Sequence, residues 1–506
     1  MKGLMEETGL GLPLLWASVA APAIAGTVSG LYASRIGRRG HVLLNSGSWL
    51  ISLLLLLPPA AAALGGRVVL DPLWARVPGV GVFSLFLDAV GAAMALTIAV
   101  VSLLVALYSS PYMEHRFEEM GLDERHWGVY YLLYQLFTAG MLGAVMAGNG
   151  ILFYLFLELT LIPSALLIVL YGYGDRVRVG LIYLVWTHLG ALLYLLGLFL
   201  IHSYDFYLPG SGYVTGAGGG HALALALIVV GLAVKMAMSG LHLWLPYAHA
   251  EAPTPVSALL SPLLIGIGAY AMLRAGVGFF PRLWGSVSPI LLLWALATML
   301  YGGFLVLAQR DVKRLLAYSS ISQMGYLMLG LAAANPVGET GTVLHYMAHA
   351  LGKAILFGVA GVFIVGLGTR DLGELGGLLQ RMPYTAAVAL LGFMMISGIP
   401  PTLGMWSEVY LVFGFARWAS GYGPGAFVVL AAGVAAAMTL TAVYSFLAFR
   451  NMFLGRPGRA YERAGEEGVR GLLAPLVALA VLGVALFILV NLVAGPVLSL
   501  LRQVYG

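Results

Sequence analysis

Long apolar runs follow one another along the chain, and most of the charged residues lie in the short segments between them. A helix that crosses the hydrocarbon core of a bilayer needs about 20 apolar residues, and backbone exposed to lipid has to be helical. The pattern predicts an all-α, polytopic membrane protein with 14 transmembrane helices. The predicted spans are residues 11–33, 42–64, 80–108, 129–147, 151–171, 179–201, 222–241, 254–273, 290–307, 315–332, 342–367, 386–416, 427–448 and 472–492.

The composition agrees with a chain that is dissolved in lipid. Of the 506 residues, 61% are hydrophobic and 9% are charged. Soluble domains carry about a quarter charged residues, so a water-soluble globular enzyme is excluded. The chain has no cysteine, which excludes disulfides and thiolate-bound iron–sulfur clusters on it. No linker is long enough to separate a second domain, and residues 1–506 are predicted to form a single domain.

The basic residues indicate how the chain is oriented in the membrane. Of the 26 lysines and arginines, 17 lie in the odd-numbered loops and 7 in the even-numbered loops and the termini. Because cytoplasmic loops carry the excess of basic residues, the odd loops are predicted to be cytoplasmic. Both termini then lie on the outer side of the cell membrane. The net charge of +5 reflects this orientation and does not indicate nucleic-acid binding.

Two ionisable residues, Glu158 and Lys235, lie inside the predicted fifth and seventh spans. A charge at mid-bilayer costs roughly 2.5–3.5 kcal/mol on insertion scales, so such residues usually mark ion pathways. At about 4 Å and an effective dielectric near 20, their attraction is about 4 kcal/mol. We therefore expect them to pair, and withdrawal of the carboxylate to release a proton from Lys235. The structural alternative is a protonated Glu158 that ties two helices together.

The predicted eleventh span carries His345, His349 and Lys353 at positions i, i+4 and i+8, on one face of the helix. Histidine titrates near neutral pH, which suits a proton relay. The lysine one turn further along favours a proton wire over a haem or metal site. Haem ligation by the two histidines and purely structural hydrogen bonding are the alternatives.

Prolines predict that two of the spans are broken. Glu408 follows Pro400 and Pro401 in the twelfth span, and these prolines cannot continue a helix. The segment that joins the seventh and eighth spans is similarly interrupted by prolines. Freed backbone groups need water or protein partners, so each break is a natural place for a hydrated path. Asp88 and His188 are weaker candidates, for which local hydrogen bonding is the alternative.

Five motifs resemble those of the antiporter-like membrane subunits of complex I and of Mrp sodium/proton antiporters. The run KMAMSGLHLWLPYAHAEAPTPVSA, which includes Lys235, His242 and His249, is similar to the family signature. The other four are RDVKRLLAYSS at 310–320, HALGKAILF at 349–357, FSLFLD at 83–88 and YSSPYM at 108–113. Taken together, these motifs are specific and extend over most of the chain.

The resemblance implies a fold of 14 core helices in which helices 4–8 and 9–13 form two inverted repeats. The regions would be residues 1–127 for helices 1–3, 128–276 and 288–450 for the repeats, and 471–506 for helix 14 and the C-terminus. It also implies a proton path, and its terminal glutamate is similar to that of the M-type subunits. The implied path residues are Glu158, Lys235, His349, Lys353 and Glu408, with His188, His242, His249 and His345 as secondary candidates.

The chain departs from the family at one position of this path. Family members usually carry a lysine in helix 8, whereas Gly266 occupies that site here. The chain of protonatable side chains is therefore interrupted. Water in the space left by the glycine, with His349, His345 or His188 as substitutes, is expected to bridge the gap. A degenerate subunit that does not pump protons is the alternative.

The resemblance thus implies a proton-translocating membrane subunit of a complex I-like donor:quinone oxidoreductase. Protons are expected to enter near Lys235, pass His349 and Lys353, and leave through Glu408, driven by redox work in other subunits. This chain would hold no cofactor, metal or redox site, and its partners would be other membrane subunits and the bilayer. The alternatives are a subunit of an Mrp-type antiporter or of a membrane-bound hydrogenase-like complex, and a haem-carrying membrane oxidoreductase.

Overall fold

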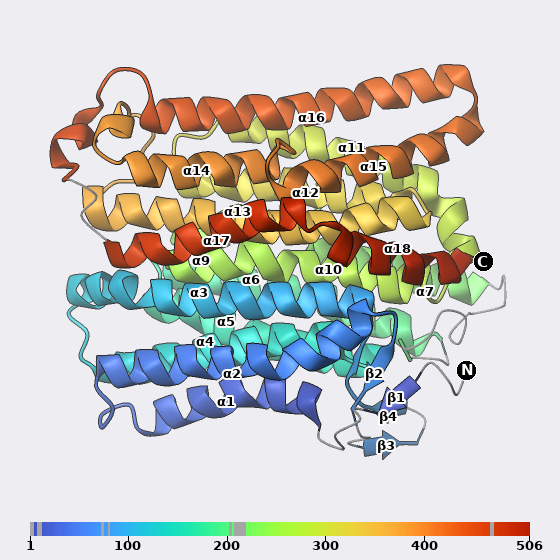
Figure 1. Cartoon of the computed structure of the whole chain (residues 1–506), viewed down its shortest axis with the longest axis horizontal. Coiled ribbons are helices and arrows are strands. Elements are labelled where there is room, and N and C mark those ends of the chain that lie inside the picture. Colours follow the sequence, from blue (N-terminus) through green and yellow to red (C-terminus); the bar gives the residue numbers. More distant parts are fainter. Residues whose placement is uncertain are drawn as a thin grey trace.

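Nearly all of the chain is folded into one bundle of helices that run roughly alongside one another (Figure 1). The computed structural model describes residues 5–7, 13–71, 75–78, 81–201, 205–206, 219–465 and 470–505. In this part of the chain, 12 helices are long and apolar enough to cross a membrane. The protein is therefore an all-α, polytopic membrane protein, as predicted.

The elements follow the order of the predicted spans. The helices are α1 (Leu14–Leu31), α2 (Arg38–Leu64), α3 (Ala89–Met120), α4 (Arg125–Met146), α5 (Gly150–Tyr171), α6 (Arg176–Phe199), α7 (Gly219–Lys235), α8 (Trp244–Glu251), α9 (Thr254–Leu259), η1 (Leu260–Leu264), α10 (Ile265–Ala271), η2 (Met272–Val277), α11 (Pro281–Leu307), α12 (Val312–Ala332), α13 (Pro336–Leu367), η3 (Leu378–Gln380), α14 (Pro383–Ile396), α15 (Leu403–Ala419), η4 (Ser420–Tyr422), α16 (Pro424–Phe453), η5 (Arg459–Arg463), α17 (Arg470–Ile488) and α18 (Asn491–Tyr505). The strands are β1 (Met5–Glu7), β2 (Val68–Leu70), β3 (Ala75–Val77), β4 (Gly81–Phe83) and β5 (Phe86–Leu87).

The predicted third span began too early. Residues 81–87 form the short strands β4 and β5, and α3 begins only at Ala89. β2 pairs in parallel with β1 and antiparallel with β5, while β3 and β4 form a separate antiparallel pair. Asp88 ends the strand segment because its side chain accepts a hydrogen bond of 2.8 Å from the backbone N–H of Gly91 and so caps α3.

Both predicted breaks are present in the structure. The seventh span was expected to run on to residue 241, but α7 ends at Lys235, and the shorter α8 follows after a turn. The indole N–H of Trp244 in α8 donates to the carbonyl of Val234 at 2.9 Å, which holds the two pieces together. α14 ends before the proline pair and α15 begins at Leu403. Gly398 turns the chain between them with a φ of 63°.

Helix α13 lies in the middle of the bundle. It packs against α3, α9, α12, α14, α15 and α17, and almost all of its side chains are buried. The outer helices differ, because most residues of α6 and α16 are not buried inside the bundle. Helix α16 runs along one edge of the bundle in Figure 1. Exposed leucines, valines and phenylalanines on such helices form the surface that faces lipid.

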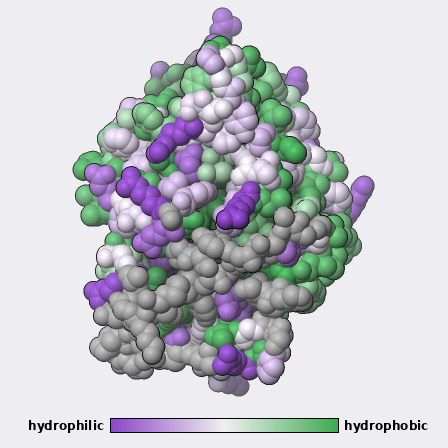
Figure 2. All heavy atoms as spheres, turned by 90° about the vertical axis from the view of Figure 1, so that its right-hand side faces the viewer, coloured by the Kyte–Doolittle hydropathy of each residue, from purple (hydrophilic) through white to green (hydrophobic). Residues whose placement is uncertain are grey.

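The strands and the end of α18 lie at the same end of the bundle (Figure 1). Figure 2 looks onto this end and shows hydrophilic side chains gathered on the end face, with hydrophobic ones around the flanks. Polar ends and apolar flanks are the distribution that a bilayer requires. The short helix α18, which follows α17, was not predicted from the sequence.

Candidate functional site

Glu158 and Lys235 do not pair as expected. Oε2 of Glu158 on α5 lies within hydrogen-bond distance of His188 on the neighbouring α6, at 3.0 Å from its Nδ1. Its other oxygen, Oε1, is buried and has no hydrogen-bond partner among the described residues. The titratable partner of Glu158 is therefore His188, which the sequence had offered only as a weaker candidate.

Lys235 lies at the break of the seventh span and not within a continuous helix. It is the last residue of α7 and is 2% exposed. Its ammonium group benefits from the negative end of the helix dipole at this position. Within the described part of the chain, Lys235 has no carboxylate within ion-pair distance; Glu158 instead pairs with His188.

His345, His349 and Lys353, which we call the α13 stripe, are all buried in the central helix. The Lys353 ammonium donates to the carbonyl of Leu316 at 2.9 Å and to the hydroxyl of Ser319, both on α12. Both ring nitrogens of His349 are buried without a hydrogen-bond partner in the described structure. A buried polar group of this kind costs free energy and calls for a functional reason.

The stripe is linked to Glu408 through α15. Nδ1 of His345 lies 3.0 Å from the hydroxyl of Ser407, the residue before Glu408. The ring of His345 stacks on Tyr326 of α12 with 5.0 Å between the ring centroids. Glu408 is 9% exposed, and its Oε1 has no hydrogen-bond partner in the described residues. A carboxyl group therefore lies buried beside the break between α14 and α15, next to the end of the stripe.

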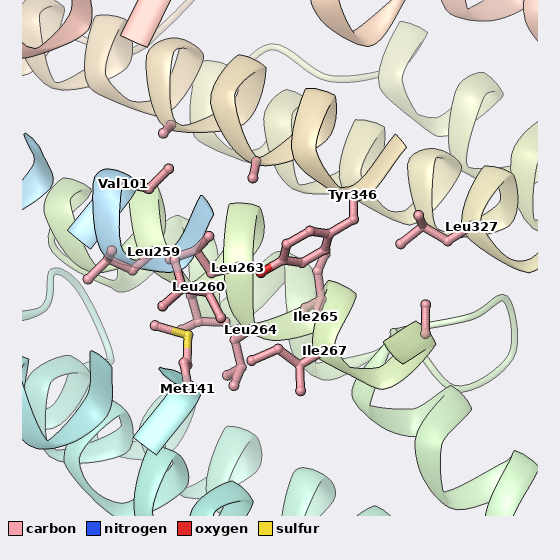
Figure 3. Close-up of a cluster of buried hydrophobic side chains, with 14 of the residues drawn as sticks. Val101, Met141, Leu259, Leu260, Leu263, Leu264, Ile265, Ile267, Leu327 and Tyr346 are labelled. Atoms are coloured by element: carbon pink, nitrogen blue, oxygen red, sulfur yellow. The ribbon is translucent and has the colours of Figure 1, made fainter. Parts of the chain in front are cut away.

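The gap at Gly266 is filled by a side chain and not by water, which corrects the expectation from the sequence. A Cβ at Gly266 would lie 2.6 Å from Cε2 of Tyr346, so the tyrosine ring occupies the space next to the glycine. A cavity of only about 10 Å³ remains beside it, at the lower limit for one water molecule. Figure 3 shows the Tyr346 ring among apolar side chains that include Leu260 and Leu263.

Helix α10 separates Lys235 from the stripe. It contacts α7 on one side and α13 on the other. Gly268 approaches α7, where an added Cβ would be 2.6 Å from Cγ of Met236, and Gly266 approaches Tyr346 of α13. The hydroxyl of Tyr346 is buried without a hydrogen-bond partner in the part of the chain that the structure describes.

The other two secondary histidines lie at α8 and in the turn before it. His242 lies in the turn before α8 and is 3.2 Å from the hydroxyl of Tyr301 on α11. His249 lies within α8, is fully buried and stacks on Phe357 of α13 with 5.0 Å between centroids. Neither ring nitrogen of His249 has a hydrogen-bond partner among the described residues.

Sequence reasoning missed two buried groups. Lys313 was counted among the basic residues of the odd-numbered loops, but it is fully buried at the start of α12 and donates to the carbonyls of Ala250 and Ala252. Glu339 on α13 is also fully buried and accepts a hydrogen bond from the hydroxyl of Tyr505 on α18. Glu339 lies just before the predicted eleventh span of residues 342–367, and only the earlier start of α13 at Pro336 places it in the helix.

The arrangement does not suit haem ligation by His345 and His349. Bis-histidine ligation needs two imidazoles on opposite sides of the iron, and these two rings lie on one face of one helix. The ring of His345 is also covered by Tyr326. Among the described residues, no group of three or more histidine, aspartate or glutamate side chains is arranged to hold a metal ion.

Comparison with known families and structures places the chain among proton-translocating membrane subunits. A family model described as NADH:quinone oxidoreductase/Mrp antiporter, TM, matches residues 147–451. A second, described as NADH-Ubiquinone oxidoreductase (complex I), chain 5 N-terminus, matches residues 78–120. The first match covers nearly all of the chain from α5 to α16, and the second covers β4, β5 and α3; α4 lies between the two matched regions.

Similar proteins lead to the same family. NADH-quinone oxidoreductase subunit N of Desulforudis audaxviator is 33% identical over 458 residues, 87% of each chain. NADH-quinone oxidoreductase subunit M of Rhodobacter capsulatus is 30% identical over 518 residues, covering 98% of this chain and 95% of the relative. A chain in the structure of respiratory complex I from Thermus thermophilus with bound NADH is 25% identical, with a TM-score of 0.80 over 97% of this chain and 100% of that one. The chain therefore belongs to the family of antiporter-like membrane subunits of NADH:quinone oxidoreductase and Mrp complexes.

Proposed function

We propose that this chain is the proton-translocating membrane subunit of a complex I-like oxidoreductase in the cell membrane, with both termini on the outer side. It contributes no redox site, and redox work in other subunits drives it. Glu158 and Lys235 change their charge state in response to that work. The α13 stripe and Glu408 carry protons across the membrane. Residues 128–276 and 288–450 are proposed to form the two repeats.

The observation that carries this proposal is the line of buried polar groups from Lys353 along α13 to Glu408. Lys353, His349 and His345 follow one another along the helix, and His345 contacts Ser407 at 3.0 Å. All three are buried, so lipid does not reach them. Ionisable groups at this depth are costly, and a path for protons accounts for why they are kept. The broken helix beside Glu408 provides backbone groups that water can solvate on the way out.

The proposal is tested in the assembled complex, reconstituted into vesicles with a donor and a quinone. We expect Glu408→Gln and Lys235→Met to lower the number of protons translocated per two electrons while electron transfer continues. Glu462→Gln, which removes an exposed acid from η5, serves as the matched control. An unchanged proton stoichiometry in both variants of the proposed path would refute the role of this chain in translocation.

A subunit of an Mrp-type sodium/proton antiporter is the second candidate, because the matching family model covers both kinds of complex. The subunits that purify with the chain distinguish the two. Quinone-reducing and iron–sulfur subunits support the oxidoreductase, and the small proteins of a multi-subunit antiporter support the second candidate. A hydrogenase-like membrane complex would be recognised in the same way by its hydrogenase subunits.

A further inference from the structure

A cavity of about 670 Å³ opens where the ends of α3, α8 and α13 meet the segment before α12. These ends belong to odd-numbered loops, which the distribution of basic residues predicts to be cytoplasmic. The cavity has room for many water molecules. Four carboxylates line it: Glu119, Glu251, Asp311 and Asp371. Arg310 and Arg370 line it as well, and the opening lies outside the path described above.

Lys313 is buried just behind the wall of this cavity. The aromatic ring of Tyr173, which lines the cavity, lies 5.6 Å from its Nζ. Nζ donates to the carbonyls of Ala250, at 3.4 Å, and Ala252, at the end of α8. Arg370, another lining residue, donates to the same Ala250 carbonyl at 2.5 Å and pairs with Asp311 at 2.6 Å. The ammonium group is thus held by backbone oxygens at the edge of the cavity.

His249 connects Lys313 with the stripe. It directly precedes Ala250, whose carbonyl accepts from Lys313, and its ring stacks on Phe357, one turn beyond Lys353 on α13. Because both ring nitrogens are buried without partners among the described residues, His249 is free to accept and to donate a proton.

The route from Lys235 to the stripe, by contrast, is closed by apolar contacts. α10 lies between α7 and α13, and it presents Gly268 to Met236 and Gly266 to Tyr346. The space for water beside Gly266 is about 10 Å³. The polar side chain of α10, Tyr270, donates its hydroxyl to the carbonyl of Val145 at 2.7 Å and so does not link Lys235 to His349.

We propose that the cavity and Lys313 form a proton entrance for the α13 stripe that is separate from Lys235. This inference rests on the proposed function of the stripe. The Lys313 ammonium gives a proton to one ring nitrogen of His249, and the other ring nitrogen gives one to the neutral amine of Lys353. The neutral amine left on Lys313 then takes up a proton from water in the cavity.

The test compares four variants of the assembled complex in vesicles. Lys313→Arg keeps the charge and the hydrogen bonds to the carbonyls, but arginine does not release its proton. We expect this variant to lose about tenfold or more of the proton translocation that depends on Glu408, matching Glu408→Gln. Tyr346→Phe removes only the unpartnered hydroxyl, and Arg314→Met removes an exposed charge next to Lys313; both should translocate protons normally.

The outcomes separate this inference from the proposed function. Normal translocation in Lys313→Arg together with a loss in Glu408→Gln would overturn the entrance and leave the proposed function standing. A loss in Tyr346→Phe would also overturn it, because protons would then cross α10. Normal translocation in both Lys313→Arg and Glu408→Gln would instead overturn the proposed function.

A second measurement does not depend on how well Lys313→Arg folds. The chain has no cysteine, so a cysteine introduced at Thr369, which lines the cavity, is its single thiol. We expect a charged, membrane-impermeant thiol reagent to modify Thr369→Cys from the cytoplasmic side only and to lower proton translocation. Ser286→Cys on α11 should react from the opposite side without this effect. Modification of Thr369→Cys that leaves translocation unchanged would overturn the entrance.

Discussion

The buried ion pair between Arg274 and Asp88 gives a quantitative test of how η2 is joined to the start of α3. The two guanidinium nitrogens lie 2.7 Å and 2.6 Å from the two carboxylate oxygens, and the side chains are only 12% and 4% exposed. The guanidinium also lies 5.0 Å from the ring centroids of both Phe86 and Tyr270. Removing one partner of such a pair leaves an uncompensated buried charge.

We expect Asp88→Asn to lower the free energy of unfolding by about 3–5 kcal/mol, because Arg274 is left charged and unpaired. Asparagine can still accept the capping hydrogen bond from Gly91, so the loss reports mainly on the ion pair. Arg274→Met should cost a similar amount. The double variant removes both charges and should cost well under the sum of the two, because the two sites interact directly.

The assay is reversible unfolding of the purified chain by a denaturing detergent in mixed micelles, followed by tryptophan fluorescence. Asp123→Asn is the matched control, since its partner Arg125 lies 4.0 Å away and both side chains are mostly exposed. That control should change the free energy by less than about 1 kcal/mol. Equal destabilisation by the double variant and by the sum of the single ones would refute the argument, because the two charges would then act independently.

Further predictions concern the loop after α2, the α10 contact and the haem alternative. Burial raises the pKa of Asp71 from 3.8 to about 6, so the folded state keeps its proton to a higher pH and stability falls as the pH rises through this range. Asp71→Asn should remove this loss of stability with rising pH. Thermal melting of both proteins between pH 4 and 7 is the measurement, and the same pH dependence in the variant would contradict the assignment to Asp71. Gly266→Ala should cost about 1–3 kcal/mol, because the new Cβ collides with Tyr346; unchanged unfolding would contradict this packing. An absorption spectrum of the purified chain should lack a Soret band, and stoichiometric haem absorption would overturn the assignment of the stripe.

Much of the fold could be predicted because the signal for a transmembrane helix is local. A run of apolar residues reports its own burial in lipid, and the proline pair reports its own break at residues 400–401. The start of α3 was missed for the opposite reason. Residues 81–87 are as apolar as the helix that follows. They contain strands only because β4 pairs with β3 and β5 pairs with β2. α7 likewise ends at Lys235 because of a turn with a positive φ at Ala237, which hydropathy does not reveal.

The candidate site could be predicted in part. The spacing of His345, His349 and Lys353 was sufficient to place them on one face of a helix, and α13 bears this out. The partners of ionisable groups were not predictable, because they come from other helices. His188 takes the place next to Glu158 that Lys235 was expected to occupy. Tyr346 fills the space at Gly266, although 80 positions separate them in the sequence.

The buried charges of this chain therefore divide by the kind of partner they have. Arg274 and Asp88 form two charge-assisted hydrogen bonds with each other, and such a pair fixes the fold but has no proton to spare. Lys313 and Lys353 are held by neutral carbonyls and a hydroxyl, and His249 and His349 have no partners among the described residues. A lysine beside neutral oxygens can lose its proton without leaving an unpaired carboxylate behind, whereas an arginine in a bidentate pair cannot. Substitutions in the first set should consequently change stability and assembly, and conservative substitutions in the second should change proton translocation in a complex that still assembles.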